Sequence, residues 1–156
     1  MRLFWIIPLL ALGACGAEGA SGGSGGGASQ RSDAETAALM ASLPAPYNEA
    51  DLDNGRRVFA RCRACHTIVE GGANMTGPNL HGVFGRTAGT HDGYAYSRAL
   101  SGAGFQWDAE KLDHWLENPS TFLPGNRMSF VGVADATDRR DLIAWLKVES
   151  GYTPPA

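Results

Sequence analysis

The sequence Cys62-Arg63-Ala64-Cys65-His66 decides how the rest of the chain is interpreted. It has the form C-x-x-C-H, which is the signature of covalent haem attachment. Two sulfurs at this spacing can each bond to one vinyl group of the same porphyrin, and the imidazole of the next residue can then bind the iron. The sequence therefore predicts one covalently bound haem, attached through Cys62 and Cys65 and ligated by His66.

Two other kinds of site use a pair of cysteines at this spacing. A thioredoxin-like redox pair is expected within a βαβ pattern, and the flanking sequence shows no such pattern. A structural zinc site normally has four ligands, most of them sulfur, whereas the sequence after residue 47 contains only two cysteines. Haem attachment is the interpretation that accounts for both cysteines and for the histidine beside them.

Three segments have the apolar spacing of amphipathic helices: residues 51–61, 109–117 and 137–149. Gly55 lies in the middle of the first segment, where glycine costs about 1 kcal/mol relative to alanine. Close approach of another helix would explain that cost, and the last segment, which has a broad apolar face, is the expected partner. We therefore predict an all-α fold.

Residues 68–106 are rich in glycine and turns and contain few strand candidates. So long an irregular stretch is unusual inside a compact domain. A large cofactor is one feature that can support it, which agrees with the haem signature.

The amino-terminal segment predicts export and attachment to a membrane. Residues 1–14 have a positive start, an apolar run and small residues before Cys15. The run is shorter than the roughly 20 residues of a membrane-spanning helix. It resembles the signal peptide of bacterial lipoproteins, which is cleaved before a cysteine that is then acylated. We expect lipidation of Cys15, and the alternative is a soluble exported protein cleaved nearby.

Residues 15–47 connect this anchor to the folded part. Their first half is rich in Gly, Ser and Ala, so it should behave as a flexible linker. Ser32 or Asp33 is expected to cap a short helix that runs to Leu43, where Pro44 would end it. We expect this helix to be a spacer or a minor docking element outside the core.

Composition sets further bounds. The 156 residues carry a formal net charge of −3, and no extended basic patch is visible. General affinity for nucleic acid would require a basic excess, so this class of partner is not expected. The stretch over residues 48–152 has a common size for a domain with one core.

This stretch also resembles class I cytochrome c, specifically its mitochondrial-like bacterial branch. The matching motifs occur in the order of that family: Gly55 and Phe59, the haem signature, Gly77-Pro78-Asn79-Leu80-His81-Gly82 with Arg86, Trp107, Leu116-Glu117-Asn118-Pro119, Pro124-Gly125-Asn126-Arg127-Met128 and Asp141-Leu142-Ile143-Ala144-Trp145-Leu146. The resemblance implies the cytochrome c fold, with three to five helices around one covalently bound haem c.

The resemblance also implies roles for single residues. His66 would be the proximal iron ligand, and the carbonyl of Pro78 would accept its other ring N–H, which fixes the orientation of the ring. Met128 would be the distal ligand, and a His/Met pair raises the reduction potential. Arg86 and Trp107 would hydrogen-bond the haem propionates, with simple core packing as the alternative for Trp107.

Other residues receive lesser roles. Met75 is expected to be a loop residue on the proximal side. Histidines outside the signature are expected at the surface or near the propionates: His81, His91 and His114. Arginines are expected at the exposed haem edge, or else as ordinary solvated surface: Arg63, Arg86 and Arg127. The chain departs from the family at three positions near the haem, which should alter the potential: Trp115 for Tyr, Asn126 for Thr and Leu100 for Asn.

An iron with both axial positions filled has no open site for substrate, which leaves transfer of one electron through the haem edge. We therefore expect a monomeric electron carrier, not an enzyme, tethered to the cell membrane and facing the periplasm. The resemblance suggests a quinol–cytochrome c reductase as donor and a terminal cytochrome oxidase as acceptor. The alternatives are delivery to a dedicated periplasmic reductase or peroxidase, and a haem-based sensor in which Met128 does not bind.

Overall fold

The computed structural model describes residues 31–154, so the predicted signal peptide and lipidation site at Cys15 lie outside the described residues. The helices are, in chain order, α1 (Asp33–Ala41), the 3₁₀ helix η1 (Tyr47–Glu49), α2 (Leu52–Phe59), α3 (Arg98–Ser101), α4 (Ala109–Glu117), α5 (Pro119–Phe122) and α6 (Ala136–Glu149). This part of the chain contains no β-strand, so the all-α prediction is confirmed. None of its helices has the length and apolar character needed to cross a bilayer.

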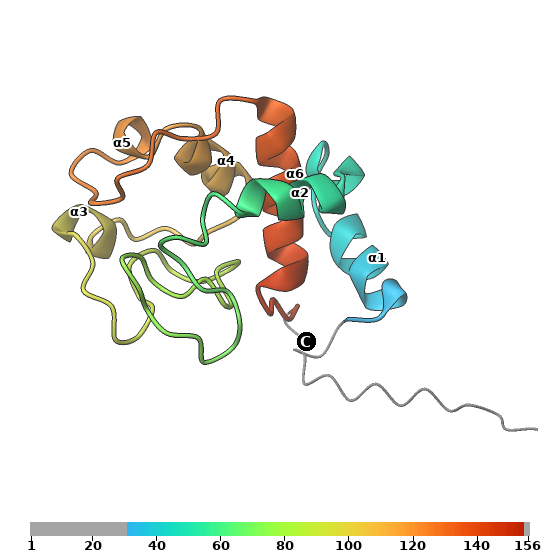
Figure 1. Cartoon of the computed structure of the whole chain (residues 1–156), viewed down its shortest axis with the longest axis horizontal. Helices are drawn as coiled ribbons and strands as arrows, with labels where there is room; N and C mark the ends of the chain where they lie inside the picture. The colour runs from blue at the N-terminus through green and yellow to red at the C-terminus, as the bar shows by residue number, and fades with distance from the viewer. Residues whose placement is uncertain (1–30, 155–156) are drawn as a thin grey trace, which may run out of the picture.

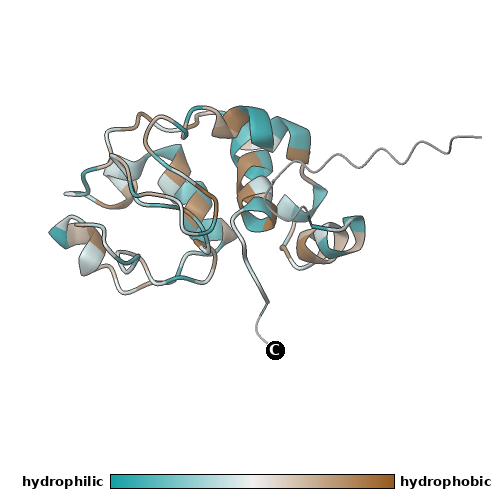
Figure 2. Cartoon of the chain, turned by 60° about the horizontal axis from the view of Figure 1, so that its bottom comes forward, coloured by the Kyte–Doolittle hydropathy of each residue, from teal (hydrophilic) through white to brown (hydrophobic). Residues whose placement is uncertain are grey.

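Helix α6 is the centre of the fold. Figure 1 shows α1 and η1 on one side of it, α4 on the other, and α2 crossing it. Residues 141–148 are all buried because neighbouring elements surround the helix. In Figure 2 the helices carry both hydrophobic and hydrophilic stretches, as expected for amphipathic helices packed around one core.

The crossing of α2 over α6 depends on Gly55. A Cβ atom at this position would collide with the carbonyl oxygen of Asp141 and would lie 2.6 Å from the Cβ of Trp145. Beside this contact, the rings of Phe59 and Trp145 pack with their centroids 4.4 Å apart. The close helix approach expected from Gly55 is therefore confirmed, and α6 is the partner.

Helix α1 was expected to be a spacer or a minor docking element outside the core, and the structure differs in joining this segment to the core. It begins after a Ser32 cap, as the sequence indicated, but it packs on the domain. Leu39 and Leu43 are only 3% and 5% exposed, and Leu43 belongs to the main hydrophobic core. Arg31 donates a hydrogen bond of 2.7 Å to the carbonyl of Tyr152. The physical reason is that α6 has apolar residues on more than one side, and α1 covers a side that α2 and α4 leave open.

The buried position of Leu43 leads to a testable prediction. Leu43→Ala should lower the free energy of unfolding by about 2–4 kcal/mol, because it removes buried methyl groups and leaves a cavity. Chemical denaturation of the haem-loaded protein would measure this. Val69→Ala is the matched control, since Val69 is 53% exposed and its truncation should cost no more than about 0.5 kcal/mol. Equal stability of the two variants would mean that this segment is only a spacer.

Candidate functional site

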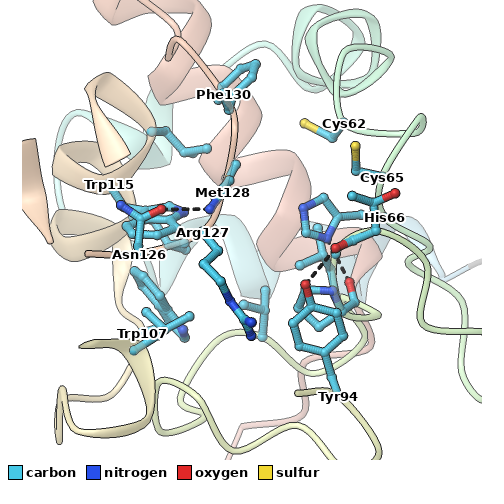
Figure 3. A pocket seen from close by; sticks show the side chains of 18 of the residues that line it. Cys62, Cys65, His66, Tyr94, Trp107, Trp115, Asn126, Arg127, Met128 and Phe130 are labelled. Carbon is cyan, nitrogen blue, oxygen red and sulfur yellow. Dashed lines mark hydrogen bonds between the residues drawn. The ribbon is translucent and has the colours of Figure 1, made fainter. Parts of the chain in front are cut away.

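A cavity of about 280 Å³, which we call the crevice, lies among the loops beside α2, α4 and α6. Its lining includes every residue that the sequence analysis assigned to the haem: Cys62, Cys65, His66, Pro78, Arg86, Trp107 and Met128. Figure 3 shows His66 and Met128 on opposite sides of the crevice, with both cysteines next to His66. Segments far apart in the sequence therefore meet around one space.

The ring of His66 is held in one orientation. Its Nδ1 lies 2.7 Å from the carbonyl oxygen of Pro78. Because a carbonyl only accepts, Nδ1 carries the proton and Nε2 has a free lone pair. Burial lowers the pKa of His66, and the hydrogen bond to Pro78 opposes this only in part. The imidazole is therefore neutral at pH 7, which is the form that binds a metal.

The loop under His66 is supported by residues to which the sequence analysis gave no role. A Cβ atom at Gly77 would lie 2.7 Å from the Nδ1 of His66, so only glycine leaves room for the ring. The Gly77 amide donates to the carbonyl of Cys65 at 2.9 Å. Asn79 is 1% exposed and donates to the hydroxyl of Thr67 at 2.6 Å. In the sequence, only the motif that contains Gly77 and Asn79 pointed to these residues. Their contacts could not be predicted, because they depend on the folded loop.

Cys62 and Cys65 line the crevice beside His66 and form no disulfide within residues 31–154. Burial raises the pKa of Cys62 to about 11, so its thiol is protonated at neutral pH. A redox-active dithiol depends on a cysteine with a lowered pKa, and burial shifts Cys62 in the opposite direction. Among residues 31–154, no cluster of three or more His, Cys, Asp or Glu side chains could hold a metal ion.

On the opposite side, Asn126 organises the loop that carries Met128. Its side-chain nitrogen donates to the carbonyls of Pro119 at 2.8 Å and Leu123 at 2.9 Å. Its side-chain oxygen accepts the amide N–H of Met128 at 2.8 Å. From the sequence, Asn126 was only a departure from the family, whereas in the structure it is bonded to three points of the loop.

The charge and burial of Arg86 indicate whether the crevice fits a haem. The guanidinium is partly buried, and burial lowers the pKa of Arg86. It donates to the carbonyl of His81 at 2.7 Å and to that of Asn79 at 3.3 Å, and it forms no ion pair within the described part of the chain. A buried cation is stabilised by an anionic partner, and a haem propionate supplies that charge. The donor set therefore fits the group that the signature predicts.

The remaining candidates divide into those at the crevice and those outside it. Met75 is 48% exposed and is absent from the crevice lining, as expected for a loop residue. Arg63 is exposed and also lies outside the lining, whereas Arg127 and the unanticipated Arg61 belong to it. The crevice lining also includes five other residues near the expected haem: Leu80, Leu100, Trp115, Asn126 and Phe130.

Comparison with known proteins agrees with this geometry. The family model for cytochrome c matches residues 52–148. Cytochrome c of Stellaria longipes is 42% identical over 102 residues, which cover 65% of this chain and 94% of that protein. Cytochrome c 2.1 of Caenorhabditis elegans is 43% identical over 112 residues, covering 71% and 96% respectively.

A solved structure agrees as well. Cytochrome cH from Methylobacterium extorquens matches with a TM-score of 0.60 and 42% identity, covering 63% of this chain and 98% of that one. The family match spans more than half of the sequence, and the crevice brings the haem signature and its expected partners together. The chain therefore belongs to the cytochrome c family of electron carriers, which bind one covalently attached haem c.

Proposed function

We propose that this protein is a membrane-tethered monohaem cytochrome c that carries single electrons from a quinol–cytochrome c reductase to a terminal oxidase. The observation that supports this most is the placement of His66 and Met128 on opposite sides of one crevice, with two cysteines beside His66. The haem supplies a one-electron couple between Fe(III) and Fe(II). If His66 and Met128 bound the iron from their two sides of the crevice, no position would be left for a substrate.

The side chains of the crevice would each contribute to this couple. Cys62 and Cys65 would hold the haem through thioether bonds, and His66 would bind the iron through its free Nε2. The sulfur of Met128 is a soft, neutral donor that favours Fe(II) and so raises the potential. Arg86 would pair with a propionate, and Trp107 would donate its indole N–H to the same region. Apolar side chains exclude water from the crevice: Leu80, Val83, Leu116, Phe130 and Leu146.

The membrane tether belongs to this proposal because of residues 1–30. The lipoprotein-like leader and Cys15 would anchor the chain to the periplasmic face of the cell membrane, and the Gly/Ser-rich segment would link the anchor to the domain. Linking a binding module to its site makes the encounter intramolecular, with an effective concentration on the order of mM. A tethered carrier would thus search for membrane complexes locally.

Mass spectrometry of the protein extracted from membranes would test the attachment of both groups. The expected mass is that of the chain from Cys15 with lipid and one haem added. A colourless protein with the bare polypeptide mass, made in a host with working haem-ligation machinery, would refute the haem assignment. Haem without lipid would refute only the tether. A deletion strain with undiminished oxidase-dependent respiration would refute the proposed acceptor.

The three hydrogen bonds of Asn126 give a further prediction. Asn126→Ala should loosen the loop around Met128 and increase the affinity of the oxidised protein for added imidazole by about tenfold, which corresponds to the loss of one or two hydrogen bonds. Spectroscopic titration would measure the affinity. Asn118→Ala is the control, because Asn118 caps α5 through the amide of Thr121 at 3.0 Å and does not line the crevice. The same affinity in both variants would contradict the role of Asn126.

A further inference from the structure

His91 contacts the arginine that lines the crevice. Its Nδ1 lies 3.2 Å from Nη1 of Arg86. Because a guanidinium can only donate, Nδ1 is the acceptor, so His91 is neutral and carries its proton on Nε2. The other acceptors of Arg86 are the backbone carbonyls of His81 and Asn79. Within residues 31–154, His91 is therefore the titratable side chain that bonds to Arg86.

The groups around His91 make its protonation sensitive to the charge inside the crevice. The groups that face it are Arg86, Asp92, His81 and Tyr96. Burial and the charge of Arg86 lower the pKa of His91, the carboxylate of Asp92 opposes them, and His81 adds a smaller lowering effect. A proton on Nδ1 would remove the acceptor of Arg86 and place a second cation against it. Any added positive charge in the crevice makes that state less favourable.

Electron transfer changes the charge of the crevice by one unit. In the oxidised carrier the crevice would hold one more positive charge than in the reduced carrier, and Arg86, which lines the crevice, contacts His91. A positive charge inside a site that excludes water acts over a longer distance than it would in solvent. The proton affinity of His91 must therefore be higher in the reduced protein than in the oxidised protein.

We propose that His91 is a redox-linked proton site, which binds a proton when the carrier is reduced and releases it when the carrier is oxidised. On reduction, one electron from the reductase enters the crevice, and a fraction of the molecules bind one proton from solvent at Nδ1 of His91. On oxidation, the electron passes to the acceptor and the proton returns to solvent. The inference rests on the proposed function, because it requires a haem in the crevice.

The test is a pH titration of the haem-loaded full chain. The ring signals of His91, followed by NMR, should titrate with a proton affinity that is higher in the reduced state by roughly three- to tenfold. Accordingly, the reduction potential should fall as the pH rises over roughly pH 4 to 8, which brackets the ordinary histidine pKa of about 6.5. A threefold difference in affinity corresponds to about 30 mV, since a tenfold change in a one-electron equilibrium is 59 mV.

Two matched variants show whether the pH dependence of the reduction potential comes from His91. In His91→Asn, the amide oxygen can still accept from Arg86 but does not titrate, so the potential should be independent of pH and close to the high-pH value of the wild type. His114→Asn is the control, because His114 is exposed and lies against Phe122, with 6.5 Å between ring centroids. This control should keep the wild-type dependence.

Three results would overturn the proposal: identical His91 titrations in both oxidation states, a wild-type potential that does not change with pH, or a dependence that survives in His91→Asn but is lost in His81→Asn. The mass and visible spectrum of each sample show whether haem is attached. Loss of haem would count against the proposed function, whereas attached haem without proton linkage would refute only the role of His91. The NMR titration needs no variant, so it decides the matter even if a substitution prevents folding.

Discussion

Replacing Met128 by alanine is expected to lower the reduction potential by roughly 0.1–0.3 V, within the range of about 0.8 V that axial ligands span. The thioether stabilises Fe(II), and alanine offers no donor in its place. The reduced variant should also bind CO, because one face of the iron becomes open. Redox titration and the absorption spectrum with and without CO would measure both effects. The long-wavelength band of an Fe(III)–thioether bond should disappear from the oxidised spectrum.

Met75→Ala is the matched control, since Met75 is 48% exposed and lies outside the crevice lining. It should leave the potential, the thioether band and the resistance to CO unchanged. If the wild-type protein itself bound CO readily, Met128 would not be a ligand, and the sensor alternative would gain support. If Met75→Ala removed the band instead, the ligand assignment would pass to Met75.

Replacing Gly55 by alanine is expected to destabilise the haem-loaded protein by about 2–3 kcal/mol, or to prevent its accumulation. Helix propensity alone favours alanine by about 1 kcal/mol, so the sign of the effect is decided by packing. The new methyl group would collide with the carbonyl of Asp141, and this backbone atom cannot rotate away as a side chain would. Such overpacking typically costs 1–3 kcal/mol and sometimes more. The midpoint of chemical denaturation would measure the loss.

Gly102→Ala provides the control for a glycine whose Cβ would not meet another helix. Gly102 ends α3 with φ of −94°, and its Cβ would approach the carbonyl of Arg98 at 3.3 Å. Its effect should stay within about 0.5 kcal/mol, as for most surface substitutions. A Gly55→Ala protein at least as stable as the wild type would show that α2 can move away from α6 without loss.

Four of the helices and the residues expected to hold the haem could be predicted from the sequence, whereas η1, α3, α5 and the crevice residue Arg61 were not predicted. The segment predicted over 109–117 agrees with α4, and those over 51–61 and 137–149 differ from α2 and α6 by two residues or fewer at each end. Local spacing carries this information, because amphipathic periodicity and caps act over a few neighbouring residues. The signature C-x-x-C-H is likewise local, since both thiols and the imidazole belong to one short segment.

Contacts between distant segments could not be predicted in the same way. Three contacts depend on where the folded chain places each group: the docking of α1 on α6, the hydrogen bonds of Asn126, and the contact between Arg86 and His91. The spacing of apolar residues does not indicate which surface an amphipathic helix will pack on. It also does not indicate which backbone carbonyls will lie within hydrogen-bond distance of a side-chain amide. The sequence alone determined the haem attachment and the helical class. The tertiary structure decided how α1 packs on the domain and which polar groups surround the crevice, because these depend on distances in space between residues remote in the chain.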